Sequence, residues 1–187
     1  MRNQWVILVF ALCLLGSGCA FGTRRPVLSY TVTGESQPNK NINIYVEQFK
    51  DDRLDQDVIG HVRNGWGMKT AKVVTTTNIS SWVTEALKAE LSNVGYNVVE
   101  TPNMSNVIGG EVIKVYCDSY MSYDGEVGIE VDLSVNGKEI YSRKYLGKNS
   151  SMNFAARAKS YGKTLEKALQ TALIDATHDI DRELNNP

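Results

Sequence analysis

Few side chains in this sequence have the types and spacing that catalysis or metal binding requires. The two histidines, His61 and His178, have no second histidine or cysteine at a metal-ligand spacing. Asp175, His178 and Asp181 could together hold a metal ion weakly, but a solvated helix face explains them equally well. A Gly-x-Ser-x-Gly elbow is absent, and residues 65–70 have the wrong spacing for a phosphate-binding loop. The sequence therefore predicts that the protein is not an enzyme and has neither a metal nor a cofactor.

Cys19 has the clearest chemical context. It follows a wholly apolar run from Trp5 to Leu15. That run has about 11 residues, whereas a membrane-spanning helix needs roughly 20. Behind the single basic residue Arg2, such a run is typical of a signal peptide. The small residues 16–18 resemble the bacterial lipobox, although Gly16 stands where leucine is commonest. The resemblance implies cleavage of residues 1–18 and lipidation of Cys19; an ordinary signal peptide with a chance cysteine is the alternative.

The location of the mature protein follows from this lipid. Several acyl chains on Cys19 would hold the protein firmly at a membrane. Ala20 stands where an aspartate would favour retention in the inner membrane, so analogy favours the outer membrane and its periplasmic face. The net charge of −1 argues against nucleic acid as a partner, and the lack of a polybasic run to hold an acidic membrane surface means that attachment to a membrane must come from the lipid. Cys117 is the only other cysteine left after cleavage, so we expect it to be buried and unpaired.

The first half of the mature chain contains a predicted tether, residues 19–41, which is rich in glycine, proline and polar residues. Alternating apolar residues predict a strand from Ile42, and a second strand is expected at 71–77. Between them lies a long polar loop, 51–70, of a length that is usually functional. Apolar residues at helical spacing from Ile79 predict a helix that stops at Gly95, followed by a strand at 96–100.

The second half predicts a meander and a final helix. Residues 127–135 alternate between apolar and polar types, and Asn136-Gly137 then fits a type I′ turn into a returning strand at 138–146. Residues 107–117 should pair on the other side, and the last helix carries an apolar stripe from Leu165 to Leu184. We therefore expect one α+β domain, residues 42–187, with two helices packed on one face of a mainly antiparallel or mixed sheet.

The stretch from Ile42 to Val99 resembles the YajG family of lipoproteins. The resemblance depends on the order of several short motifs: Asp51-Asp52-Arg53, Ile59-Gly60, Arg63-Asn64, Gly67-Met68-Lys69-Thr70-Ala71, Asn78-Ile79, Trp82-Val83, Ala86-Leu87-Lys88-Ala89-Glu90-Leu91 and Gly95-Tyr96. It covers about a third of the chain and implies a location and a fold more than an activity.

Two groups of residues are candidates for binding a partner. Arg53, Arg63 and Trp66 lie in or beside the glycine-rich loop, and arginine and tryptophan dominate binding hot spots. The alternative is that Arg53 pairs with the preceding acidic residues and that Trp66 covers the sheet edge.

The second group is Tyr141, Arg143 and Tyr145, which share the returning strand, with packing on the sheet as the alternative. The leading hypothesis is a tethered, non-enzymatic module that binds another envelope protein or a second copy of itself. The other hypothesis is a carrier for a small ligand or lipid.

Overall fold

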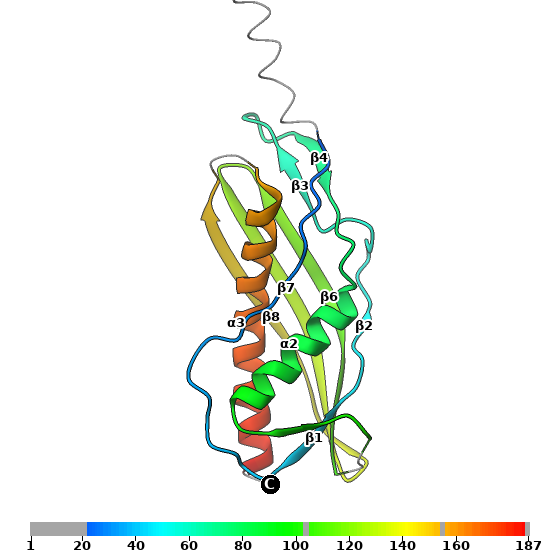
Figure 1. Cartoon of the computed structure of the whole chain (residues 1–187). Coiled ribbons are helices and arrows are strands. Elements are labelled where there is room, and N and C mark those ends of the chain that lie inside the picture. Colours follow the sequence, from blue (N-terminus) through cyan, green and yellow to red (C-terminus); the bar gives the residue numbers. More distant parts are fainter. Residues whose placement is uncertain (1–21, 103–104, 154–155, 186–187) are drawn as a thin grey trace, which may run out of the picture.

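A large, curled, mixed sheet with two helices over one of its faces makes up the domain (Figure 1). The computed structural model describes residues 22–102, 105–153 and 156–185. The predicted α+β class is confirmed, and in Figure 1 both helices lie over the same face of the sheet. The elements are β1 (Asn43–Val46), β2 (Lys50–Asp51), β3 (Gly60–Arg63), β4 (Lys69–Val73), α2 (Ile79–Asn93), β5 (Asn97–Val99), β6 (Asn106–Ser119), β7 (Ser122–Val135), β8 (Lys138–Met152) and α3 (Ala158–Asn185).

The prediction of a mainly antiparallel sheet is wrong. Strands β1, β2 and β3 all pair in parallel with β6, and β5 pairs in parallel with β1. Among the described strands, the pairs β3–β4, β6–β7 and β7–β8 are the antiparallel ones. The alternation of apolar residues marks a strand but not its direction. Helix α2 carries the chain back across the sheet between β4 and β5, so that β5 runs in the same direction as β1.

The predicted meander is confirmed along its whole length. Strands β6, β7 and β8 pair as neighbours, and β7 turns into β8 at Asn136-Gly137. Both turn residues have positive φ, 52° and 77°, as a type I′ turn requires. Of the predicted dry face of β7, the residues from Val127 to Leu133 are fully buried beneath the helices, and Val135 is partly buried.

The two helices supply the other half of the core. Helix α2 begins at Asn78, whose side chain accepts a hydrogen bond from the Ser81 backbone N–H at 2.9 Å, and ends before Gly95. The long helix α3 buries the predicted stripe against β6, β7 and β8, although Leu184 is only partly buried. Neither helix in the described part of the chain is long and apolar enough to cross a bilayer. The predicted members Leu165, Leu169, Ala172, Ala176 and Ile180 are fully buried, and Tyr161, Ala168 and Leu173, which were not predicted, are buried beside them.

Residues 24–41, predicted as part of a tether, are bound along the domain. The Arg24 backbone N–H donates to the Lys72 carbonyl at 3.0 Å, and Leu28 is buried in the core. The indole of Trp82 in α2 donates to the Ser29 carbonyl at 2.9 Å, and Gln170 in α3 donates to Thr33 at 2.7 Å. This segment, here called the strap, therefore contacts both helices. Its proline and glycine content resembles that of a linker, but its apolar residues have a place in the core.

The long loop predicted at 51–70 is in part a β-hairpin. Strands β3 and β4 pair between Gly60 and Val73, and only residues 52–59 and the hairpin tip at 64–68 lie outside strands. The hairpin extends the sheet beyond β6 at the end of the molecule where the described chain begins (Figure 1).

Candidate functional site

Three segments that are distant in the sequence meet at this end of the molecule, here called the apical end. They are the β3–β4 hairpin tip, the β6–β7 turn at Tyr120-Met121, and the chain on either side of residues 154–155. The Tyr120 hydroxyl donates to the Gly65 carbonyl at 2.9 Å, which joins the turn to the hairpin. The Asn153 N–H donates to the Met121 carbonyl at 3.2 Å, which joins the third segment to the turn. The strap enters here, where Arg24 Nε donates to the Ala156 carbonyl at 2.7 Å.

The hairpin tip holds Trp66 in an exposed position. The Asn64 side chain accepts from the backbone N–H groups of Trp66 and Met68, each at 3.0 Å. The Asn64 N–H donates to the Met68 carbonyl, and the Gly67 N–H donates to the Asn64 carbonyl. These bonds satisfy the polar groups of the tip locally, so the tip is ordered without burying its tryptophan. The Trp66 side chain is 86% exposed and does not cover the sheet edge.

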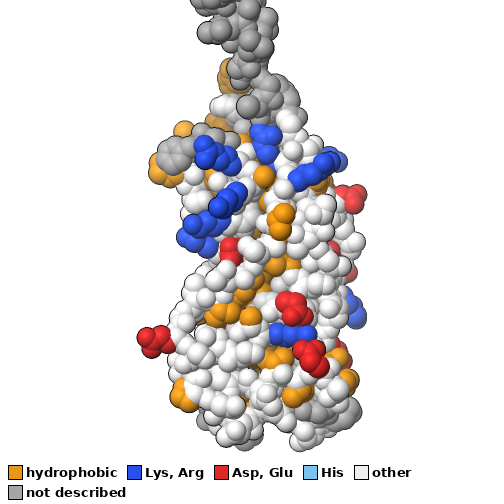
Figure 2. Space-filling model, viewed as in Figure 1, with side chains coloured by type: hydrophobic (Ala, Val, Ile, Leu, Met, Phe, Trp, Pro, Cys, Tyr) orange, Lys and Arg blue, Asp and Glu red, His pale blue; other side chains and the backbone are white. Residues whose placement is uncertain are grey.

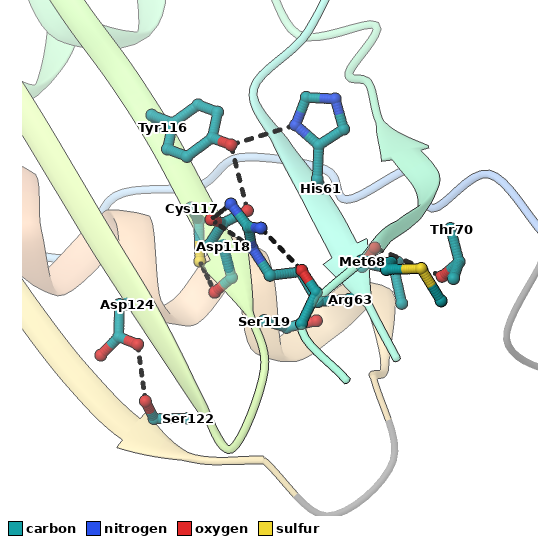
Figure 3. Close-up of polar contacts among 12 residues, drawn as sticks. His61, Arg63, Met68, Thr70, Tyr116, Cys117, Asp118, Ser119, Ser122 and Asp124 are labelled. Carbon is teal, nitrogen blue, oxygen red and sulfur yellow. Dashed lines mark hydrogen bonds and ion pairs between the residues drawn. The ribbon is translucent and has the colours of Figure 1, made fainter. Parts of the chain in front are cut away.

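Arg63 fastens the hairpin tip to the central strand β6. Its Nε and Nη2 atoms contact one carboxylate oxygen of Asp118 at 2.8 and 2.6 Å, and its Nη1 donates to the Gly67 carbonyl at 2.8 Å (Figure 3). The ion pair with Asp118 raises the pKa of the Arg63 guanidinium above its ordinary value. Arg63 thus links the base of the hairpin, its tip and the neighbouring strand.

A tyrosine and a histidine continue this network along the outer face of the sheet. The Tyr116 hydroxyl donates to Asp118 at 3.0 Å and lies 3.0 Å from His61 Nδ1 (Figure 3). Because the hydroxyl proton is used on Asp118, His61 must donate from Nδ1. Burial and the nearby positive charge of Lys69 lower the pKa of His61, while burial and Asp118 raise the pKa of Tyr116 to about 12. Both side chains are therefore neutral near pH 7.

The nucleophilic side chains nearest in the sequence lie on the other face of the sheet. Cys117 is fully buried, as predicted, and burial raises the pKa of its thiol far above the ordinary value. Ser119 is also fully buried, and its hydroxyl is hydrogen-bonded to Tyr161 of α3. Among residues 22–102, 105–153 and 156–185, no three histidine, cysteine or acidic side chains form a group that could hold a metal ion. The contacts of the His61–Arg63 network therefore position the hairpin on β6.

Arg53, predicted as a partner-binding residue, lies largely inside the fold. Its side chain is 5% exposed and forms two contacts with the Asp51 carboxylate, at 2.7 and 2.8 Å. It also donates to the Gln56 carbonyl at 3.1 Å. Arg53 therefore holds the turn between β2 and β3 together, which was the alternative reading of this residue.

The predicted tyrosine surface faces α3. Tyr145 is buried, and its hydroxyl donates to Asp179 of α3 at 3.0 Å; Arg143 donates to the same carboxylate at 2.7 Å. Tyr141 is partly buried, and its hydroxyl lies 3.3 Å from that of Tyr145. Burial alone would raise the pKa of Asp179, but its bonds to Arg143 and Tyr145 outweigh burial and lower it. These three predicted residues thus attach β8 to α3.

The sequence analysis missed four exposed apolar residues at the apical end. They come from three separate segments, so no local pattern connects them before the chain folds. The available signal was Trp66 between two glycines, followed directly by Met68. The prediction of lipidation concerns Cys19, which lies outside the residues that the structure describes. The missed residues are Met68, Tyr120, Met121 and Met152.

Comparisons with known proteins support the fold and no more. No family model and no curated protein matches the chain, so the resemblance to the YajG family stays a prediction. A crystal structure described only as an uncharacterized protein superimposes with a TM-score of 0.54 at 12% identity, over 85% of this chain and 99% of that one. Protein XCC0632 from Xanthomonas campestris, of family DUF330, superimposes with a TM-score of 0.51 at 13% identity, over 86% and 99%. At these identities the likeness establishes a shared architecture.

Proposed function

We propose that the chain is a lipid-anchored envelope protein that acts as a non-enzymatic interaction module, held by Cys19 at the periplasmic face of the outer membrane. The observation that carries the proposal is the position of Trp66. It stands exposed on a hairpin that Asn64 and Arg63 hold in one geometry, at the end of the domain where the chain arrives from Cys19. A rigid, exposed tryptophan costs little entropy to bind, which is typical of an interaction hot spot.

The lipid anchor can be tested by itself. Cells that express the full chain would be labelled with an alkyne fatty acid, and the label would be sought on the purified protein by mass spectrometry. We expect label on wild type and none on Cys19→Ser, and we expect Cys19→Ser to leave the membrane fraction. A Cys19→Ser form that fractionates with membranes just as the parent does would overturn the anchor.

The interaction site can be tested with matched variants in intact cells. Trp66→Ala removes the exposed tryptophan, whereas Ile140→Ala removes an exposed apolar side chain near the opposite end of β8. Crosslinking followed by mass spectrometry should show crosslinked envelope components that are lost with Trp66→Ala and kept with Ile140→Ala. The same crosslinks in both variants would remove the hairpin from the proposal.

The alternative of a ligand carrier would need an apolar cavity between the helices and the sheet. Two open grooves border the strap instead: one of about 370 Å³ against α2, lined by Leu28, Tyr30 and Trp82 among others, and one of about 520 Å³ at the ends of both helices, which includes Glu35, Lys40, Glu90 and Asp181. The apolar side chains between helices and sheet are fully buried against one another. Extraction of purified protein with organic solvent, followed by lipid analysis, would revive the carrier hypothesis if it released a stoichiometric lipid.

A further inference from the structure

Exposed apolar side chains gather at the apical end from all three of its segments. Trp66 and Met68 come from the hairpin, Tyr120 and Met121 from the β6–β7 turn, and Met152 from the end of β8. Met121 and Met152 are 79% and 74% exposed. Hydrogen bonds between the segments, including the one from Tyr120 to Gly65, hold them together. A group of exposed apolar side chains of this kind marks an interaction surface.

Basic side chains surround this apolar group. The exposed ones are Arg25, Lys69, Lys72, Arg157 and Lys159. Among the acidic residues near it, Asp118 is ion-paired with Arg63, Asp124 accepts hydrogen bonds from Ser122 and Ser150, and Asp55 lies near His61. Most Lys and Arg side chains on the face shown in Figure 2 lie towards the end at which the chain enters. Because the whole chain carries a net charge of −1, this positive end implies a balancing negative charge elsewhere.

The covalent path to the lipid restricts where this end can lie. Arg24 is fixed to β4 through its backbone and to the Ala156 carbonyl through its side chain. The five residue steps from Cys19 to Arg24 span at most about 17 Å when fully extended. Strand β8, from Lys138 to Met152, runs the length of the domain and spans about 50 Å at the ordinary strand rise. An acylated Cys19 therefore keeps the apical end next to the bilayer, whereas the opposite end can stand well away from it.

From these observations we infer that the apical end binds the surface of a bilayer that contains anionic lipids, with Trp66, Met68 and Met121 in the headgroup region and the surrounding Lys and Arg side chains on lipid phosphates. The inference rests on the proposed lipid anchor and names the bilayer, in place of a protein, as what Trp66 of the proposed interaction site contacts; a protein partner at Trp66 is the competing outcome. Tryptophan is enriched at the membrane interface, and basic side chains gain energy at an anionic surface. In this orientation the rest of the domain stands upright on the bilayer, with β8 and α3 directed away from the membrane.

Tryptophan fluorescence can test this contact directly. The full chain is expressed in bacteria, its lipidation on Cys19 is verified by mass spectrometry, and the protein is reconstituted in vesicles of phosphatidylethanolamine and phosphatidylglycerol. A fraction of the acyl chains is brominated near the headgroups, because bromine quenches only tryptophans that enter the interface. After loss of residues 1–18, the tryptophans are Trp66 and the buried Trp82. The signal of Trp66 is the difference between wild type and Trp66→Phe.

We expect the Trp66 emission to fall at least about twofold in these vesicles, as for a side chain 5–10 Å into the headgroup boundary. Replacing phosphatidylglycerol by phosphatidylcholine, or introducing Lys69→Glu, should reduce the quenching. The matched variant Lys138→Glu, at the β7–β8 turn on the opposite end, should leave it unchanged.

Two results would overturn the inference. One is an unquenched Trp66 in protein whose Cys19 carries the lipid; this leaves the anchor itself intact. The other is shielding of Trp66 only after an envelope extract is added, which would indicate a protein partner in place of lipid. Absence of the lipid on Cys19 is a separate outcome, read by mass spectrometry before reconstitution, and would overturn both the proposed function and this inference.

Discussion

Two regions of the molecule contain the residue types that dominate binding surfaces, and the fold uses them in opposite ways. On β8, the side chains of Tyr141, Arg143 and Tyr145 face α3 and form hydrogen bonds with Asp179 and with one another. On the β3–β4 hairpin, Arg63 is bound to Asp118, but Trp66 does not pack against the fold and projects into solvent. Both regions contain an arginine and an aromatic side chain on a strand or at its end.

The difference between them is the helix that packs nearby. Strand β8 lies beneath α3 along much of its length, so its tyrosines are desolvated and find hydrogen-bond partners there. The hairpin extends beyond the helices, and its arginine supports a turn rather than the core. An aromatic residue with a buried ring and a hydrogen-bonded hydroxyl stabilises the fold, whereas an exposed aromatic residue on an ordered turn is available to a partner.

The largest expected difference between the two regions concerns a pair of glycines. A Cβ at Gly147 of β8 would lie 1.8 Å from the Ala168 carbonyl oxygen of α3, whereas nothing lies within 4 Å of one at Gly65 in the hairpin. Gly147→Val should lower the free energy of unfolding by at least about 3 kcal/mol, or abolish folding, because helix and strand must separate. Gly65→Ala should change it by less than about 0.5 kcal/mol. Urea denaturation measures both, and equal losses would contradict the close packing of β8 on α3.

Truncation of one aromatic residue in each region is the direct test of the comparison. Tyr145→Ala removes a buried ring and leaves the Asp179 carboxylate short of a donor, so we expect a loss of about 3 kcal/mol in the free energy of unfolding. Trp66→Ala removes an exposed side chain and should cost less than about 0.5 kcal/mol. Thermal and urea unfolding would show the difference. A Trp66→Ala protein as unstable as Tyr145→Ala would mean that the hairpin tryptophan supports the fold.

The contribution of the β8–α3 cluster should depend on pH. The pKa of Asp179 lies below its ordinary value of 3.8 in the folded protein, so its bonds stabilise the fold at neutral pH. That stabilisation is complete above the unfolded-state pKa and is lost as the pH falls through the lowered folded-state pKa. At pH 7, Asp179→Asn should be less stable than wild type by about 1 kcal/mol. Urea titrations should show this difference in the free energy of unfolding shrinking below about pH 4. A difference that is independent of pH would contradict the stabilising role of the Asp179 carboxylate.

The smallest effect concerns the support of the hairpin. Arg63→Ala removes the contacts to Asp118 and Gly67, which are partly exposed, so we expect only a small and local loss of stability. Hydrogen exchange should speed up at the hairpin amides with little change in global unfolding. The matched variant Arg143→Ala breaks an ion pair of similar exposure on β8 and should leave hairpin exchange unchanged. Equal exchange at the hairpin in both variants would show that Arg63 does not hold it.

Local patterns in the sequence predicted the elements well and their arrangement less well. The helix stop at Gly95, the stripe of α3 and the Asn136-Gly137 turn are correct because each depends on residues a few positions apart. The parallel pairing of β3 with β6 joins His61 to Asp118, which no local pattern connects. The strap was predicted as a tether because its prolines and glycines resemble those of a linker, while Leu28 has its place in a core made by distant residues.

By itself the sequence determined where strands and helices lie, that Cys117 would be buried, and which arginines and aromatic residues were candidates for binding. The tertiary structure decided which of those candidates remain exposed. Tyr145 meets Asp179 and Arg63 meets Asp118 across separations of 34 and 55 residues, so partners of this kind exist only after the sheet has formed. The apical end likewise has no counterpart in the linear chain, because its apolar and basic side chains come together only when three distant turns meet.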